Sequence, residues 1–232
     1  RDLRMSRGLG DVYKRQLNPI VRVVDDDVRV RESEAFILRL DGWMVQEFES
    51  AADFLEKDDP DRPGCLVLDI RMPGMSGLEL QEVLRRQKRT VPILFLTGHG
   101  DIESAVMALK RGAADFVRKP MNPDDLQSAV RRLVDWHVRL CLRMKKQQEL
   151  LRLHDSLTDK EKIICRMVAR GALSKQIAID LSISEQTVKT HRSNLTHKLG
   201  LRSAVELADF LRQIDEPIET TFRIAVEATD HD

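Results

Sequence analysis

Acidic side chains end two short apolar runs that lie about forty-five residues apart. The first run leads into Asp25, Asp26 and Asp27, and the second leads into Asp69. Apolar runs of this length, bounded by polar residues, indicate buried strands. Adjacent carboxylates repel each other, and Mg²⁺, a cation that prefers oxygen ligands, relieves that repulsion. We therefore expect a magnesium pocket with one spare carboxylate.

Two further polar groups follow apolar runs, because Thr97 ends Ile93–Leu96 and Lys119 lies just beyond Ala114–Val117. In an open parallel α/β sheet, ligands bind at the carboxyl ends of the strands. Alternating strand and helix signals predict a doubly wound five-stranded parallel sheet in the flavodoxin-like order 2-1-3-4-5. The expected strands are Ile20–Val24, Met44–Phe48, Cys65–Asp69, Ile93–Thr97 and Ala114–Val117, with helices after Asp27 and from Ser50, Gly77 and Asp101.

The runs RMPGMSG, LTGHG and DFVRKP complete a pattern over residues 19 to about 138 that resembles a response-regulator receiver domain of the FixJ type. The resemblance implies that Asp69 accepts a phosphoryl group from a phosphohistidine on a sensor histidine kinase. It also implies that phosphorylation promotes a homodimer. The implied Mg²⁺ ligands are Asp26, Asp69 and the backbone carbonyl of Arg71, with Asp25 acting partly through water. The implied responders are Thr97 and Lys119, which contact the phosphoryl group, and Phe116, the switch aromatic.

Three further local features concern the Lys119-Pro120 bond, the run from Asp25 to Val28, and His99. Lys119-Pro120 is a candidate cis bond, because an X–Pro bond has a low cis penalty and this turn must aim the lysine inward. Phosphatases of the haloacid-dehalogenase type also use an aspartate nucleophile beside Mg²⁺, and Asp25-Asp26-Asp27-Val28 begins their motif. The match fails at Arg29, because that motif has Thr or Val at this position. His99 is expected to be an ordinary loop residue.

Composition divides the chain in two. Its 232 residues with 42% hydrophobic content favour two small globular domains. Residues 18–125 carry 15 basic and 21 acidic side chains, whereas residues 126–154 carry 7 and 2, residues 155–212 carry 10 and 7, and the tail from 213 carries 1 and 6. This asymmetry suggests that only the second half meets a polyanion.

Other classes are disfavoured by what the sequence lacks. No apolar run approaches the roughly 18 residues of a membrane span, and no secretory signal is recognisable, so we expect a soluble, cytoplasmic protein. Cys65, Cys141 and Cys165 are far apart and form no metal-binding spacing, which argues against disulfides and structural zinc. Residues 1–17 show no periodicity and are treated as a non-native or disordered leader.

A long helix is predicted between the two halves. The apolar positions step by fours and threes from Asp124, which resembles a short coiled-coil seam. They are Leu126, Val130, Leu133, His137, Leu140 and Met144. A helix from Asp124 to Arg152 would span about 43 Å at 1.5 Å per residue. The alternative is a helix packed on its own domain and followed by a flexible linker.

The second half has the signals of a helix-turn-helix unit. Thr158 and Glu161 form a capping box, Ser174 opens and caps a short helix, and Ser184 caps a third helix that Gly200 ends. Two helices joined by a tight turn form the helix-turn-helix motif. On the third helix, Val188, Leu195 and Leu199 share the face expected to pack inward.

Residues 155–212 resemble the LuxR-type helix-turn-helix, through LTDKEKIICRMVARG, KQIAIDLSISEQTVKTHRSNLTHKLG and LRSAVELADFL. Asn is commoner at Ser174, so a phosphate contact there is weakened. The resemblance implies that the third helix enters the major groove of double-stranded DNA. Base reading is implied for Lys189, Thr190 and Ser193, and phosphate contacts for Ser184, Thr187, Arg192 and Lys198. RNA is disfavoured because no aromatic RNA-binding pattern is present.

The sequence thus predicts a DNA-binding transcriptional regulator controlled by phosphorylation of Asp69, whose only catalysis is limited self-phosphorylation and self-dephosphorylation. Two alternatives remain, namely an aspartyl-nucleophile phosphatase and a constitutive DNA-binding protein whose first domain only dimerises. The predicted organisation is a leader over 1–17, a receiver over 18–138, a helical linker over 139–154, a DNA-binding domain over 155–212 and an acidic tail over 213–232.

Overall fold

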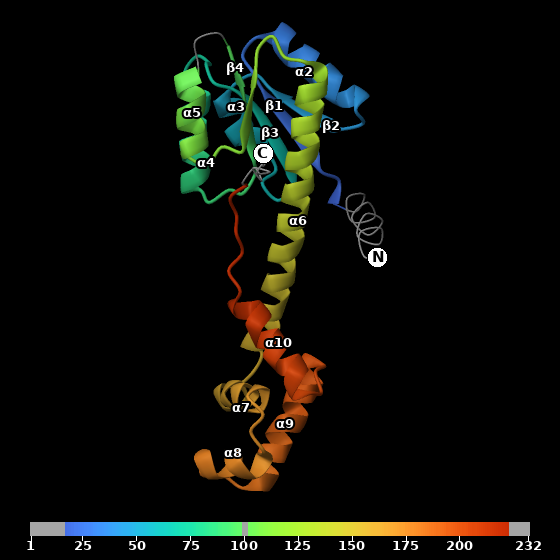
Figure 1. Ribbon diagram of the computed structural model, residues 1–232, viewed down its shortest axis with the longest axis vertical. Coiled ribbons are helices and arrows are strands. Elements are labelled where there is room, and N and C mark those ends of the chain that lie inside the picture. Colours follow the sequence, from blue (N-terminus) through green and yellow to red (C-terminus); the bar gives the residue numbers. More distant parts are fainter. Residues whose placement is uncertain (1–16, 99–101, 223–232) are drawn as a thin grey trace, which may run out of the picture. The chain divides into compact units, whose positions relative to one another are not determined.

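The computed structural model describes residues 17–98 and 102–222, which divide into two compact units (Figure 1). Of the described residues, the first unit contains 17–98, 102–141 and 220–222, and the second contains Leu142–Glu219. Residues 1–16 of the predicted leader, His99 and residues 223–232 of the predicted tail lie outside the described residues.

The first unit is built on a parallel sheet with the strand order β2-β1-β3-β4-β5, which confirms the predicted topology. The central strands β1, β3 and β4 are buried along their whole length, as their runs of Val, Leu and Ile predict. Strand bounds agree with the sequence to within one residue. They are Ile20–Val24 (β1), Met44–Phe48 (β2), Gly64–Asp69 (β3), Ile93–Thr97 (β4) and Asp115–Arg118 (β5).

Helices cover both faces of this sheet (Figure 1). One face carries α2 (Val28–Leu40) and the first half of α6 (Pro123–Asp155), and the other carries α3 (Ala51–Lys57), α4 (Gly77–Arg86) and α5 (Ile102–Lys110). Polar side chains fix the helix starts, because Asp27 caps α2 and Ser76 forms a capping box with Glu79 at α4. Phe54, Leu80 and Phe95 belong to the core beneath α3, α4 and α5.

Buried charges lie among the core residues of the first unit. Arg22 is 1% exposed, and its Nε donates to Asp58 Oδ1 at 2.5 Å. Arg89 pairs with the same carboxylate, whose side chain is fully buried. His137 on α6 is also buried, and its Nδ1 lies 3.0 Å from the Gly64 nitrogen. Burial lowers the pKa of His137 to about 4, so this imidazole is neutral near pH 7.

Helix α6 is continuous from Pro123 to Asp155, and its first half packs on its own domain. Leu126, Val130, Leu133, His137 and Leu140 are buried. The predicted coiled-coil seam is therefore wrong at these five positions, because their side chains are already buried within the chain's own first unit. Residues 139–154, which the alternative expects to be a flexible linker, are helical in the structure. Further along, Leu150 and Leu153 pack against the core of the second unit.

The second unit contains the end of α6 and four shorter helices, α7 (Asp159–Ala169), α8 (Ser174–Asp180), α9 (Glu185–Leu199) and α10 (Ala204–Asp215). Thr158 and Ser184 cap α7 and α9 as predicted, and Gly200 follows α9 with a φ of 69°. The predicted cap at Ser174 is wrong, because Leu173 is the N-cap of α8 and provides no side-chain bond. Helix α10 also runs to Asp215, beyond the predicted start of the tail.

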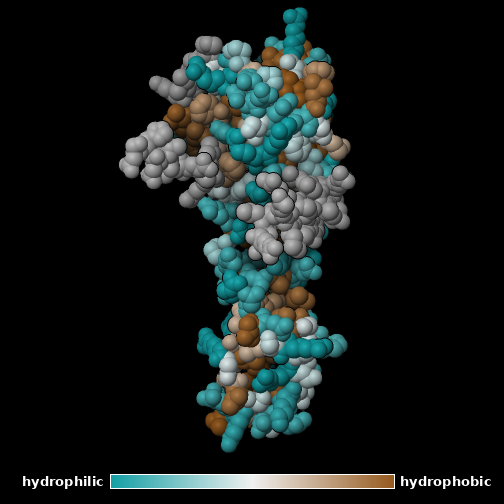
Figure 2. Space-filling model, turned by 45° about the vertical axis from the view of Figure 1, so that its right-hand side comes forward, coloured by the Kyte–Doolittle hydropathy of each residue, from teal (hydrophilic) through white to brown (hydrophobic). Residues whose placement is uncertain are grey.

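The surface is largely hydrophilic, with separate hydrophobic patches in each unit (Figure 2). Phe36 and Leu40 on α2 are among the most exposed large apolar residues, at 61% and 71%. Within the described part of the chain, no helix combines the length and hydrophobicity that a membrane span requires.

Candidate functional site

The carboxyl ends of β1, β3 and β5 bring three predicted site residues together. The Lys119 Nζ donates to Asp25 Oδ2 and to Asp69 Oδ1, in both cases at 2.6 Å. Asp25 is 2% exposed and Asp69 is 9% exposed. The strands are parallel, so their carboxyl ends lie at the same edge of the sheet. Asp25 and Lys119 are therefore bonded although they are 94 positions apart in the chain.

Backbone contacts fix these side chains. The Asp25 Oδ1 accepts from the Asp27 nitrogen at 2.9 Å, and the Asp69 Oδ2 accepts from the Arg71 nitrogen at 2.7 Å. The Lys119 nitrogen donates to the Thr97 carbonyl at 2.7 Å, and the Lys119-Pro120 bond is cis, as predicted. The two aspartates are therefore held by the turns in which they lie, and Lys119 is held by the end of the neighbouring strand β4.

Burial and charge act in opposite directions on this cluster. Burial raises the pKa of Asp69 above its ordinary value, while the Lys119 ammonium opposes the rise. Burial alone would lower the pKa of Lys119, but its hydrogen bonds to Asp25 and Asp69 outweigh burial and raise it. The lysine therefore remains charged at neutral pH.

Glu34 is part of this cluster, although the sequence analysis did not single it out. Its side chain is fully buried in α2, and its Oε1 lies 4.0 Å from the Lys119 Nζ. Burial raises the pKa of Glu34 to about 8. Helical spacing could have revealed its burial, because Glu34 lies one turn before Leu38, a residue on the inward face of α2.

The other predicted residues of the pocket take different positions. Thr97 is 2% exposed and ends β4, whereas Asp26 and Arg71 are exposed. Phe116 is partly buried, packs against the core under α3 to α5, and lies opposite Phe95 in the strand register. Its ring is therefore associated with the core, and β4 lies between its strand and the strand of Asp69.

The donor set fits a magnesium ion. Among the described residues, no three acidic, His or Cys side chains are grouped closely enough to hold a metal by themselves. Mg²⁺ keeps several waters and is usually held by only one or two carboxylates. Asp25 and Asp69 provide two buried carboxylates, and three carboxyl groups, counting Glu34, lie around one ammonium. A divalent cation would balance this acidic excess.

The second candidate site is the outer face of α9. Val188, Leu195 and Leu199 are buried at 0%, 2% and 8% exposure, as predicted. Predicted base-reading residues lie on the exposed side of the same helix, namely Lys189, Thr190 and Ser193. At the start of α9, the Thr187 nitrogen donates to Ser184 Oγ at 3.0 Å, so the cap and the predicted phosphate contacts lie together.

Two predicted phosphate ligands already have partners in the protein. The Arg192 Nη1 donates to Ser174 Oγ at 3.0 Å, which joins α9 to the start of α8. The Lys198 Nζ donates to Glu161 Oε2 at 2.7 Å and to the Ser156 carbonyl at 3.2 Å. Burial alone would raise the pKa of Glu161, but Lys198 and Thr158 lower it. A phosphate contact by Lys198 would have to compete with this ion pair or use the third N–H of the ammonium.

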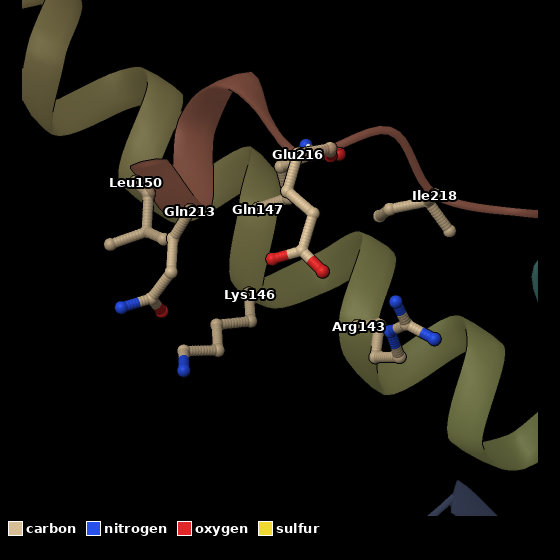
Figure 3. A pocket seen from close by; sticks show the side chains of 7 residues that line it. All are labelled: Arg143, Lys146, Gln147, Leu150, Gln213, Glu216 and Ile218. Atoms are coloured by element: carbon tan, nitrogen blue, oxygen red, sulfur yellow. The ribbon is translucent and has the colours of Figure 1, made fainter. Parts of the chain in front are cut away.

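A cavity of about 200 Å³ lies between α6 and the end of α10 within the second unit (Figure 3). Arg143 and Lys146 line it from α6, and Gln213 lies on the α10 side. The Gln147 side chain donates to the carbonyls of Ile214 and Glu216, which ties the end of α10 to α6. This cavity contains no residue of either predicted site.

Comparisons with known proteins agree with both halves. Residues 21–131 match the response regulator receiver domain family, and residues 155–211 match the bacterial regulatory proteins of the luxR family. The chain is similar to the response regulator protein TodT of Pseudomonas putida, with 37% identity over 86% of this chain and 88% of that protein. It is also similar to the transcriptional regulatory protein FixJ of Azorhizobium caulinodans, with 38% identity over 81% and 89%.

Solved structures give the same assignment. The structure of the response regulator StyR has 42% identity and a TM-score of 0.80, and covers 84% of this chain and 99% of that chain. These similarities favour a regulator over the phosphatase alternative. The chain belongs to the response regulators that join a receiver domain to a LuxR-type DNA-binding domain, and it is a phosphorylation-dependent transcriptional regulator.

Proposed function

We propose that Asp69 is the phosphoacceptor of this regulator and that a sensor histidine kinase is the donor. The observation that carries the proposal is the meeting of Asp25, Asp69 and Lys119 at the carboxyl ends of the strands. An Asp69 oxygen bonds to phosphorus while the bond between phosphorus and the donor histidine nitrogen breaks, and the electron pair stays on that nitrogen. The partly buried Lys119 ammonium would partly neutralise the charge of the transferred group.

Magnesium completes the proposed pocket. Asp26, Asp69 and the Arg71 carbonyl would hold it, with Asp25 acting partly through water. When bound, the ion neutralises charge on the transferring phosphoryl group. Before the metal binds, this chain's own residues orient the nucleophile, since Asp69 is held by the Arg71 nitrogen on one oxygen and by Lys119 on the other.

The proposed response begins with Thr97 and Lys119, which gain charge-assisted hydrogen bonds to the phosphoryl oxygens. Lys119 is bonded through its backbone to the Thr97 carbonyl, and Phe116 lies three residues before Lys119. Movement of these residues would repack the face formed by α5 and β5, which we propose becomes a homodimer contact.

Phosphorylation is expected to shift the chain from monomer to dimer. Incubation with acetyl phosphate and Mg²⁺ at micromolar protein should double the mass measured by light scattering and should tighten binding to a regulated promoter fragment. Two promoter half-sites about one helical turn apart should appear in footprints. The same mass before and after phosphorylation would instead favour the constitutive alternative.

The proposed DNA-reading helix is α9, and substitutions of its base-reading and phosphate-binding residues should have different effects on DNA binding. If Lys189 reads a base, Lys189→Ala should cost about 1–3 kcal/mol and relax preference at one base pair. If Arg192 holds a phosphate, Arg192→Ala should weaken binding to all sequences alike and lower the salt slope by about one charge. Titrations of matched and single-mismatch duplexes at several salt concentrations separate the two effects.

Lys145→Ala provides the control. Lys145 is exposed on α6, so this substitution removes one positive charge outside the helix-turn-helix. Arg192 also bonds Ser174, so the melting temperature of the Arg192 variant must be measured first. Unchanged specificity and salt dependence in both variants would mean that α9 is not the reading helix.

A further inference from the structure

Glu34 is an acid placed where an acid is costly. Its side chain is fully buried, and neither carboxyl oxygen has a hydrogen-bond partner among the described residues. A buried polar group without a partner lowers the free energy of unfolding. An apolar side chain at this position of α2 would avoid that cost, since Ala35 and Leu38 on the same helix face are apolar and buried. Rules of packing are usually broken in this way at functional sites.

The neighbours of Glu34 indicate which function this is. The Lys119 Nζ has three carboxyl groups within reach, with Asp25 and Asp69 at 2.6 Å and Glu34 at 4.0 Å. The two close carboxylates are the groups proposed to bind Mg²⁺ or its waters. The third belongs to no proposed ligand set. Of these three carboxyl groups, Glu34 is thus the one that could still accept a hydrogen bond from Lys119 after the metal binds.

We propose that Glu34 is a positioning residue that receives the Lys119 ammonium when Mg²⁺ occupies Asp25 and Asp69. This inference rests on the proposed magnesium pocket. In the structure, the ammonium lies between the two carboxylates that a metal would need. The Lys119 side chain is 22% exposed, so its displacement without a new partner would leave a partly buried charge unpaired, which is unfavourable. Glu34 removes that penalty, because a shift of the flexible lysine side chain from 4.0 Å to hydrogen-bond distance gives the ammonium a new acceptor.

Charge is consistent with this exchange. Burial raises the pKa of Glu34 to about 8, so the carboxyl group is largely protonated while Lys119 stays with the two aspartates. An ammonium that approaches it favours the carboxylate form. Glu34 can therefore be neutral before the exchange and charged after it, which avoids a third buried negative charge in the metal-free pocket.

The test is calorimetric titration of Mg²⁺ into the full chain, with the wild type, Glu34→Gln, Glu34→Leu and the control Glu32→Gln. Glu32 lies on the same helix but is exposed, so its variant removes an equal charge at the surface. Loss of a group that orients a metal site typically weakens binding by about 10–100-fold. We expect a loss in this range for both Glu34 variants and unchanged affinity for Glu32→Gln.

Melting temperature in the presence of a chelator separates positioning from support of the fold. Because Glu34 has no hydrogen bond to lose, Glu34→Leu should melt at the same temperature as the wild type or higher. Wild-type affinity in both Glu34 variants would overturn the inference and leave the magnesium pocket standing. Weaker binding accompanied by lower melting temperatures in both variants would also overturn it, as a structural role. Absence of Mg²⁺ binding by the wild type would overturn the proposed pocket itself.

Discussion

Replacing Asp69 by asparagine abolishes phosphoryl transfer from acetyl phosphate, because the amide that replaces the carboxylate is not a nucleophile. Asparagine has nearly the same shape, and Lys119 keeps its bond to Asp25, so the pocket stays folded. Intact-protein mass spectrometry in the presence of Mg²⁺ should show one added phosphoryl group on the wild type and none on the variant.

Asp53→Asn is the matched control for this experiment. Asp53 is a partly buried carboxylate on α3 that pairs with Lys57 and belongs to no proposed ligand set, so its variant should be phosphorylated like the wild type. A phosphoryl group that persists on Asp69→Asn would contradict the assignment of the nucleophile. Equal phosphorylation of the wild type without Mg²⁺ would contradict the assignment of the metal.

Asp58→Ala should cause the largest loss of stability. The Asp58 side chain is fully buried and pairs with Arg22, which is 1% exposed, and with Arg89. Removal of one partner of a buried ion pair leaves an uncompensated charge and costs about 3–5 kcal/mol. Tryptophan fluorescence during urea unfolding measures this loss in the first unit alone, because both tryptophans, Trp43 and Trp136, belong to that unit.

Asp61→Ala removes an exposed carboxylate from the same loop, and its free energy of unfolding should change by no more than about 0.5 kcal/mol. Equal stability of the Asp58 and Asp61 variants would show that Arg22 finds other acceptors. The candidates are the carbonyls of Asp59 and Arg62, to which its Nη2 already donates.

Local signals were sufficient for the fold. The five strands and the caps at Thr158 and Ser184 depend on patterns within a few residues, and the structure agrees with them. The strand order also agrees with the one expected from the alternation of strands and helices. The exception is Ser174, whose hydroxyl accepts from Arg192, eighteen residues away. A cap motif in the sequence does not show that a distant arginine competes for the same oxygen.

Contacts between distant residues were beyond the sequence. The ion pair of Lys198 with Glu161 joins residues 37 apart, so an exposed helix face and a phosphate contact were the natural interpretation of Lys198. Similarly, the apolar steps of α6 have the same spacing in a coiled coil and in a helix packed on its own sheet. Only the three-dimensional structure distinguishes these environments, because periodicity predicts which face is covered and not what covers it.

The continuity of α6 also determines how this protein can be divided for experiments. The boundary between Cys141 and Leu142 falls inside a helix, so a cut there would create a new helix start with unsatisfied backbone N–H groups. A fragment that began after α6 would lose Leu150 and Leu153 from the core of the DNA-binding unit. A fragment designed to bind DNA on its own should therefore keep the last turns of α6 and begin with a new capping residue, such as serine or aspartate, ahead of them.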